Sequence, residues 1–244
     1  LKRIIYKNSK LLNIFQLLGD YSFQPFFLLF HLTLDCNCSC INCYQIADDF
    51  YQSKNGTIMP SDFEKIIKDA KKGFIIKPAI HFFGGEPLLN PYFGEIIKIA
   101  EKNNFQCSLT TNGILLSKYL DDILKNRKLN QINISLDDIG EKHDSLRNFS
   151  GSFKEAISSI NKIREREAKK KNQKRKIINI NCIINSENYD HLFDIFSYYS
   201  ENNIDIDMLV FQHQYGGENN YDIKKLKDQI LKLKEAKTSF EIAI

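Results

Sequence analysis

The chain has 244 residues, 43% of them hydrophobic and 12% aromatic, which is enough apolar material to bury the core of one domain. Its 34 basic and 30 acidic residues are mostly interspersed and give a net charge of +4, too mild a bias to indicate a nucleic-acid partner. The most apolar stretch, residues 23–34, is about half the ~20 residues that a membrane-spanning helix needs, so we expect no membrane partner. Since no secretory signal is visible either, the expected location is cytoplasmic.

Strand-like and helix-like patterns alternate from residue 26 onward. Short β runs are predicted at residues 26–33, 78–83, 106–111, 130–136, 176–184 and 206–212. Capping boxes, Ser61 with Glu64 and Ser152 with Glu155, predict two helix starts, and Asn90 before a proline predicts a third. Further helices are predicted at residues 115–126, 188–201 and 221–237. Six β-α units in sequence indicate a parallel sheet with helical crossovers.

The two faces of the predicted strands differ in polarity. Along residues 130–136, Ile132 and Ile134 alternate with Asn133 and Ser135, so one face is apolar and the other polar. A parallel sheet packed on both faces has near-continuous hydrophobic strands instead. We therefore predict an α/β fold, a partial (β/α)6 TIM-like barrel with helices on its convex side and a polar ligand cavity on its concave side.

The predicted barrel sets the domain boundaries. Residues 26–215 would form the core and residues 1–25 an N-terminal arm. Residues 216–244 would form a C-terminal helix, which is either the start of a truncated extension or part of a shorter protein without one. Because the chain begins with Leu1 and stops at Ile244 without a terminating pattern, we expect it to be a piece of a longer protein.

Three cysteines with the spacing C-x3-C-x2-C follow the first predicted strand: Cys36, Cys40 and Cys43. Three thiolates on one loop can hold three irons of a 4Fe-4S cluster and leave the fourth iron open to a small chelating molecule. Cys38 lies inside the same loop, so a zinc site of four cysteines is the alternative, although no second cysteine pair of zinc-site spacing follows downstream.

Polar turns follow other predicted strands. After the second strand, Gly84 and Gly85 let the backbone approach a ligand, and exposed carbonyls with the Glu86 carboxylate can accept hydrogen bonds from an ammonium group. A plain tight turn is the alternative. Ser135 ends the fourth strand, and Arg147, in a predicted loop, can neutralise a carboxylate with a forked contact. Ligands gather at the carboxyl ends of parallel strands, so we expect these residues near the cysteine loop.

Taken together, the motifs resemble those of the radical SAM enzymes. The resemblance is carried by the cysteines with the adjoining Tyr44, by Gly84-Gly85-Glu86-Pro87, by Ser135-Leu136-Asp137, and by His143, Asp144 and Arg147 with the following Gly151-Ser152-Phe153. It covers most of the chain and is greatest to the SPASM/twitch-type branch that modifies peptides and proteins. This chain departs from that branch's cysteine-rich C-terminal extension, because no cysteine follows Cys182. Either that extension, which carries auxiliary clusters, is truncated, or this is a shorter enzyme without auxiliary clusters.

The resemblance implies two cofactors, a 4Fe-4S cluster and S-adenosylmethionine. The cluster ligands would be Cys36, Cys40 and Cys43, with Cys38 as an unliganded bystander. The residues around S-adenosylmethionine would be Gly84, Gly85 and Glu86 for the methionine ammonium, Ser135 for the ribose, Arg147 for the carboxylate, and Tyr44 with the backbone near Leu209 for the adenine.

The implied reaction is reductive cleavage of S-adenosylmethionine to a 5'-deoxyadenosyl radical, which removes hydrogen from an unactivated carbon. The electron would come from a reductant such as flavodoxin or ferredoxin, and the implied substrate is a peptide or protein side chain. Two alternatives stay open at this point. One is a small-molecule substrate, and the other is a non-catalytic iron-sulfur protein that binds or regulates.

Overall fold

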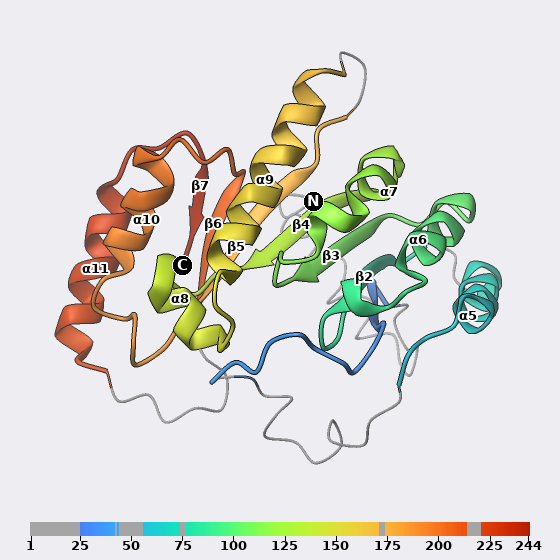
Figure 1. Ribbon diagram of the computed structural model, residues 1–244, viewed down its shortest axis with the longest axis horizontal. Helices are drawn as coiled ribbons and strands as arrows, with labels where there is room; N and C mark the ends of the chain where they lie inside the picture. The colour runs from blue at the N-terminus through green and yellow to red at the C-terminus, as the bar shows by residue number, and fades with distance from the viewer. Residues whose placement is uncertain (1–24, 42, 44–55, 74–76, 171–173, 214–220) are drawn as a thin grey trace, which may run out of the picture.

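The computed structural model describes residues 25–41, 43, 56–73, 77–170, 174–213 and 221–244. Its centre is one sheet of seven strands that lie in chain order, with every neighbouring pair parallel. The strands are β1 (Phe27–His31), β2 (Ala79–Phe83), β3 (Cys107–Thr111), β4 (Leu129–Ser135), β5 (Ile177–Ile184), β6 (Met208–His213) and β7 (Glu241–Ala243). The sheet is open and curved, with the helices along its outer side (Figure 1). The predicted α/β partial barrel is confirmed.

Helices connect each strand to the next. They are α5 (Pro60–Gly73), α6 (Phe93–Lys102), α7 (Leu120–Lys125), α8 (Gly140–Arg147), α9 (Ser152–Ala168), α10 (Leu192–Glu201) and α11 (Ile223–Glu235), with short 3-10 helices η1 (Pro87–Leu89) and η2 (Leu116–Tyr119). The longer helices carry an apolar stripe at helical spacing, as Ile96, Ile97 and Ala100 do in α6. These three residues are fully buried, which fixes the helix against the convex face of the sheet.

The core lies between the convex face and the helices. Ile132 and Ile134 of β4 and Ile178 and Ile180 of β5 are fully buried there. Strand residues alternate between faces, so the polar residues between these isoleucines lie on the concave side. The predicted polar concave face is therefore present, and it is the side available to a ligand.

The structure corrects the prediction at two elements. The three-residue strand β7 pairs with β6 inside the segment that was predicted as a C-terminal helix only, because so short a strand has no readable alternation. The segment predicted as a loop around Arg147 is helix α8, and Arg147 is its last residue. Only His143 and Leu146 of α8 are buried, so the helix lacks the apolar stripe that signals a helix in sequence.

The predicted capping box at the start of α9 is wrong. Gly151 is the N-cap and contributes no side chain. Asp144 of α8 caps the helix instead, accepting hydrogen bonds from the Gly151 amide at 2.6 Å, the Ser152 hydroxyl at 2.8 Å and the Phe153 amide at 2.9 Å. The two helices are thereby fixed to each other, which also fixes the position of Arg147.

The C-terminal elements pack on the barrel. Leu233 of α11 and Phe240 before β7 belong to the buried core, and the Phe240 ring lies 5.7 Å from that of Phe196 in α10. The boundaries 26–215 and 216–244 stay predictions, and the predicted arm lies almost wholly outside the described residues. Of the helices that the structure describes, none combines the length and the apolar character needed to cross a bilayer.

Candidate active site

The cysteine loop follows β1 and is fixed to the end of α8. The Ser39 amide donates to the Arg147 carbonyl at 3.3 Å, and the Ile41 amide donates to the Leu146 carbonyl at 3.0 Å. The Asn148 side-chain amide donates to the Ser39 hydroxyl at 2.8 Å. Residues more than 100 positions apart in sequence are thus joined, and Arg147 is brought to the cysteines.

The turn after β2 holds the same loop from another side. The Gly85 amide donates to the Thr33 carbonyl at 2.9 Å and the Glu86 amide to the Asp35 carbonyl at 2.7 Å. Gly84 has a φ of 140°, and a Cβ on Gly85 would lie 2.1 Å from the Asp35 carbonyl oxygen. The two glycines are therefore required by the close approach of this turn to the cysteine loop, a contact that neither sequence interpretation, a ligand-binding turn or a plain tight turn, had included.

Glu86 is fully buried and its carboxylate is engaged within the protein. It accepts hydrogen bonds from the Thr111 hydroxyl at 2.7 Å, the Asn112 amide at 2.8 Å and the Leu88 amide at 3.0 Å. Burial raises the pKa of Glu86 to about 7, against the opposing effect of these hydrogen bonds. The Glu86 carboxylate thus links the turn after β2 to the turn after β3. The sequence predicted two kinds of acceptor for an ammonium group, this carboxylate and the backbone carbonyls of the turn after β2, and only the carbonyls stay available.

Arg147 lies between Asp137 and a cysteine. Its guanidinium is 2.7 Å from the Asp137 carboxylate and donates a second hydrogen bond to the Cys40 sulfur at 3.5 Å. The Arg147 Nε is buried and has no hydrogen-bond partner within the described part of the chain. A hydrogen bond from Cys38 and the charge of Arg147 lower the pKa of Cys40 to about 6, so this thiol ionises readily near neutral pH.

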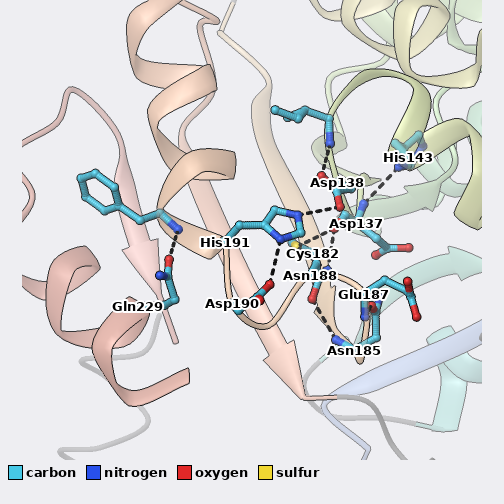
Figure 2. A network of polar contacts seen from close by, with 12 residues as sticks. Asp137, Asp138, His143, Cys182, Asn185, Glu187, Asn188, Asp190, His191 and Gln229 are labelled. Carbon is cyan, nitrogen blue, oxygen red and sulfur yellow. Dashed lines mark hydrogen bonds and ion pairs between the residues drawn. The ribbon is translucent and has the colours of Figure 1, made fainter. Parts of the chain in front are cut away.

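Asp137 is the centre of a buried polar network at the carboxyl end of β4 (Figure 2). Its carboxylate accepts from the Ile183 amide at 3.0 Å, and its carbonyl accepts from the Asn188 side chain at 2.6 Å. Its amide donates to Nδ1 of His143 at 3.1 Å. Burial lowers the pKa of His143 to about 3, so this ring is neutral and can accept that hydrogen bond. The network orients the carboxylate that holds Arg147.

The donor set of the loop fits an iron-sulfur cluster. Among the described cysteines, Cys36, Cys40 and Cys43 form no disulfide bond, and Cys36 is exposed while the other two are half-buried. A hydrogen bond from Cys38 lowers the pKa of Cys36 as well, and thiolates are the form that binds iron. Cys38 has the opposite behaviour, because its hydrogen bonds to Cys36 and Cys40 raise its pKa. In the described ranges, no three Cys, His, Asp or Glu side chains are already arranged to hold a metal ion.

The structure brings most, but not all, predicted site residues together. Ser135 ends β4 next to Asn181 of β5, at the same end of the sheet as the cysteine loop. Leu209 is only the second residue of β6, and its side chain is fully buried in the core. It is therefore not among the residues gathered at the carboxyl ends. Tyr44 lies outside the described residues.

Sequence reasoning did not assign a role to Asp137, Asn112 or Asn188. Asn112, in the turn after β3, donates to the Asn37 side chain at 2.7 Å and to the Cys38 sulfur at 3.5 Å. Asn112 and Asn188 are each a polar residue in a turn after a strand, which is a weak signal by itself. Their partners are distant in sequence, so only the fold reveals what they hold.

Comparison with known families decides the identity of the fold. A family model described as the Radical SAM superfamily matches residues 31–199. The chain belongs to the radical SAM superfamily. The match runs from the end of β1 into α10 and includes the cysteine loop, the turn after β2 and α8.

Two curated relatives can be aligned with this chain over most of its length. It is 30% identical over 208 residues to a probable GTP 3',8-cyclase of Methanococcus aeolicus, with 82% of this chain and 65% of the relative covered. It is 25% identical over 218 residues to an Fe-coproporphyrin III synthase of Methanosarcina barkeri, covering 89% and 50%. The chain thus spans about half to two thirds of the length of these curated relatives.

A solved structure confirms the radical SAM fold. Streptococcus suis SuiB bound to S-adenosylmethionine superposes with a TM-score of 0.69 at 14% identity, covering 99% of this chain and 61% of SuiB. Radical SAM proteins are enzymes that use a 4Fe-4S cluster and S-adenosylmethionine, the two cofactors expected from the sequence.

Proposed function

We propose that this chain is the catalytic domain of an enzyme that reductively cleaves S-adenosylmethionine and removes hydrogen from a peptide or protein side chain. The observation that carries the proposal is the fixation of the cysteine loop from three sides. The turn after β2, the turn after β3 and the end of α8 all donate or accept hydrogen bonds with residues 33–41. Such a frame holds the cysteine loop at the carboxyl ends of the parallel strands.

The contacts to the cluster and to the methionine part of S-adenosylmethionine are assigned to the cysteine loop and the elements that fix it, and the contacts to the ribose and adenine follow the family resemblance. Cys36, Cys40 and Cys43 bind the cluster, and the backbone carbonyls of the Gly84-Gly85-Glu86 turn receive the methionine ammonium. The Nε of Arg147, buried without a partner among the described residues, is the donor left for the methionine carboxylate. Ser135 faces the ribose, and Tyr44 and the backbone near Leu209 border the adenine.

The bound cofactors supply a single electron and, from S-adenosylmethionine, a 5'-deoxyadenosyl radical that abstracts hydrogen. The chain's own residues position and shield the reaction. Arg147, ion-paired to Asp137, neutralises negative charge beside Cys40, and the Asp137 network keeps its guanidinium in place. The polar concave face holds the substrate beside the radical and limits the access of water. The electron donor is proposed to be a flavodoxin or ferredoxin.

Two substrate classes have support. SuiB was also solved with its precursor peptide SuiA, and the fold similarity in that complex covers 99% of this chain. The named relatives, a cyclase of GTP and a synthase of Fe-coproporphyrin III, favour a small molecule. We place the peptide first because the segment from Ser135 to Gly151 is most similar to the peptide-modifying branch.

Release of 5'-deoxyadenosine tests this proposal. The protein is reconstituted with iron and sulfide without oxygen and incubated with dithionite and S-adenosylmethionine, and the nucleoside is measured by chromatography. The parent and the control Cys38→Ser are expected to release it, whereas Cys40→Ser is expected to lose at least about 99% of the rate, because a cluster ligand is gone. No release from the parent, or equal release from Cys40→Ser, contradicts the proposal.

A further inference from the structure

The concave face of β4 to β7 encloses a cavity of about 600 Å³. Its lining is dominated by carboxamide side chains, namely Gln131, Asn133, Asn179, Asn181 and Gln212. The other lining residues are Ile177, Asp207, Met208, Val210 and Glu241. No lysine or arginine of the described residues lines it. The cavity therefore offers hydrogen bonds without positive charge.

The two carboxylates of the cavity differ in their surroundings. Asp207 is 2.7 Å from the guanidinium of Arg164 and accepts the Ile178 amide at 2.8 Å, so its charge is balanced. Glu241, at the sheet edge in β7, is exposed and has no ion-pair partner in the part of the chain that the structure describes. The net charge at the end of the cavity lined by Asp207 and Glu241 is therefore negative, which repels an anionic group and attracts a hydrogen-bond donor.

A chain of hydrogen bonds across four strands fixes the orientation of the carboxamides. His81 of β2 contacts the Ser108 hydroxyl through Nδ1 at 2.7 Å and the Thr110 hydroxyl through Nε2 at 3.0 Å. Asn133 donates its amide to the Thr110 oxygen at 3.4 Å. Its own oxygen therefore faces β5, where it accepts from the Asn179 amide at 3.1 Å.

Asn179 is the last residue in this series of hydrogen bonds, and its side-chain oxygen is an acceptor that no described residue uses. Its amide nitrogen is committed to Asn133, and its Oδ1 is buried with no hydrogen-bond partner within the described residues. The residue is only 7% exposed. A buried acceptor without a partner is unfavourable, and such groups are normally satisfied by protein, water or ligand. Met208 is its register neighbour on β6 and lines the same cavity, and its unbranched side chain can move aside for a ligand.

We propose that the substrate is a peptide whose uncharged amide group enters the barrel and donates a hydrogen bond to Asn179 Oδ1. The group that fits best is a primary carboxamide side chain. This rests on the proposed function and sharpens it. Carboxamides recognise one another by paired donors and acceptors, whereas phosphate and carboxylate groups need cationic partners that this cavity lacks. The same cavity disfavours the phosphates of a nucleotide and the carboxylates of a porphyrin.

Two peptides that differ in one group provide the test. The tripeptides Gly-Gln-Gly and Gly-Glu-Gly, each acetylated at the N-terminus and blocked as a dimethylamide at the C-terminus, are titrated into reconstituted holoprotein with S-adenosylmethionine and no reductant, and binding is followed by saturation-transfer NMR. The glutamine peptide is expected to bind roughly tenfold more tightly than the glutamate peptide, because only the former carries a primary carboxamide, and the latter carries a charge at the same position. Asn179→Leu removes that preference, while Asn161→Leu, an exposed position on α9, keeps it.

Glu241→Gln provides a variant whose folding is not in question, because the side chain is exposed and unpaired among the described residues. It is expected to tighten binding of the glutamate peptide about fivefold. Equal binding of the two peptides, binding of neither, or GTP binding as tight as the glutamine peptide overturns the inference. Release of 5'-deoxyadenosine is measured on the same preparations. If 5'-deoxyadenosine is released normally but the two peptides bind equally, this inference alone is refuted. If the parent releases no 5'-deoxyadenosine, the proposed function is refuted.

Discussion

Replacing Gly85 with alanine should disconnect the turn after β2 from the cysteine loop. The added Cβ would lie 2.1 Å from the Asp35 carbonyl oxygen, whereas ordinary contact begins at 3.4 Å, so the two backbones must separate by about 1.3 Å. That displacement breaks the hydrogen bonds from the Gly85 amide to Thr33 and from the Glu86 amide to Asp35, which measure 2.9 and 2.7 Å.

The loss can be estimated from these contacts. Backbone shifts forced by an added methyl group cost about 1–3 kcal/mol, and each lost hydrogen bond costs about 1 kcal/mol. A loss of roughly 3–5 kcal/mol in the free energy of unfolding would lower Tm by roughly 6–20 °C for a chain of this size. Because the displaced carbonyl belongs to Asp35, directly before the first cysteine, cluster assembly should suffer as well.

Thermal unfolding of the cluster-free protein and iron content after anaerobic reconstitution measure the two effects. Gly73→Ala is the matched control, since a Cβ there meets nothing within 4 Å. We expect Gly85→Ala to lose stability and at least half of its bound iron, and Gly73→Ala to match the parent in iron content. A Gly85→Ala protein with the Tm and iron content of the control would refute the reasoning.

Two further predictions concern the residues behind the site. The stability of the cluster-free parent relative to Glu86→Gln should fall by about 3 kcal/mol as pH rises from 4.5 to about 7, because the folded-state pKa of Glu86 is raised and the unfolded chain ionises first. Urea unfolding at pH 5 and pH 8 measures this, and a rise in relative stability would contradict it. Asp137→Asn should cost about 2–4 kcal/mol and slow S-adenosylmethionine cleavage at least tenfold, since it unpairs the buried Arg147. Asp121→Asn, at an exposed position, should change the stability and the cleavage rate only slightly. Equal effects of the two substitutions would contradict the positioning role of Asp137.

The strands and the carboxyl-end turns could be predicted because their signals are local. Alternation of Ile132 and Ile134 with Asn133 gave the position and polarity of β4, and the glycines after β2 marked a turn. Helix α8 could not be predicted, since its buried residues are too few to form an apolar stripe. Strand β7 was missed because pairing with β6, and not its own pattern, defines it.

The hydrogen-bond partners of the buried site residues could not be predicted from the sequence. Glu86 was a plausible ligand for an ammonium group until the structure placed its carboxylate among the Thr111, Asn112 and Leu88 donors. The pairing of Asp137 with Arg147 likewise depends on where α8 ends relative to β4. Spacing in sequence identifies which residues reach one end of the sheet, while their hydrogen-bond partners are decided by three-dimensional packing.

Electron paramagnetic resonance of the reduced protein tests the central claim most directly. Oxygen-free protein is reduced with dithionite and measured before and after S-adenosylmethionine is added. If three cysteines leave one iron open, the cofactor binds that iron and the cluster signal changes its g values, and S-adenosylmethionine labelled with ¹⁷O at its carboxylate broadens the lines. An unchanged signal, in protein that contains a full complement of iron, would mean that side chains already saturate every iron and would contradict the account.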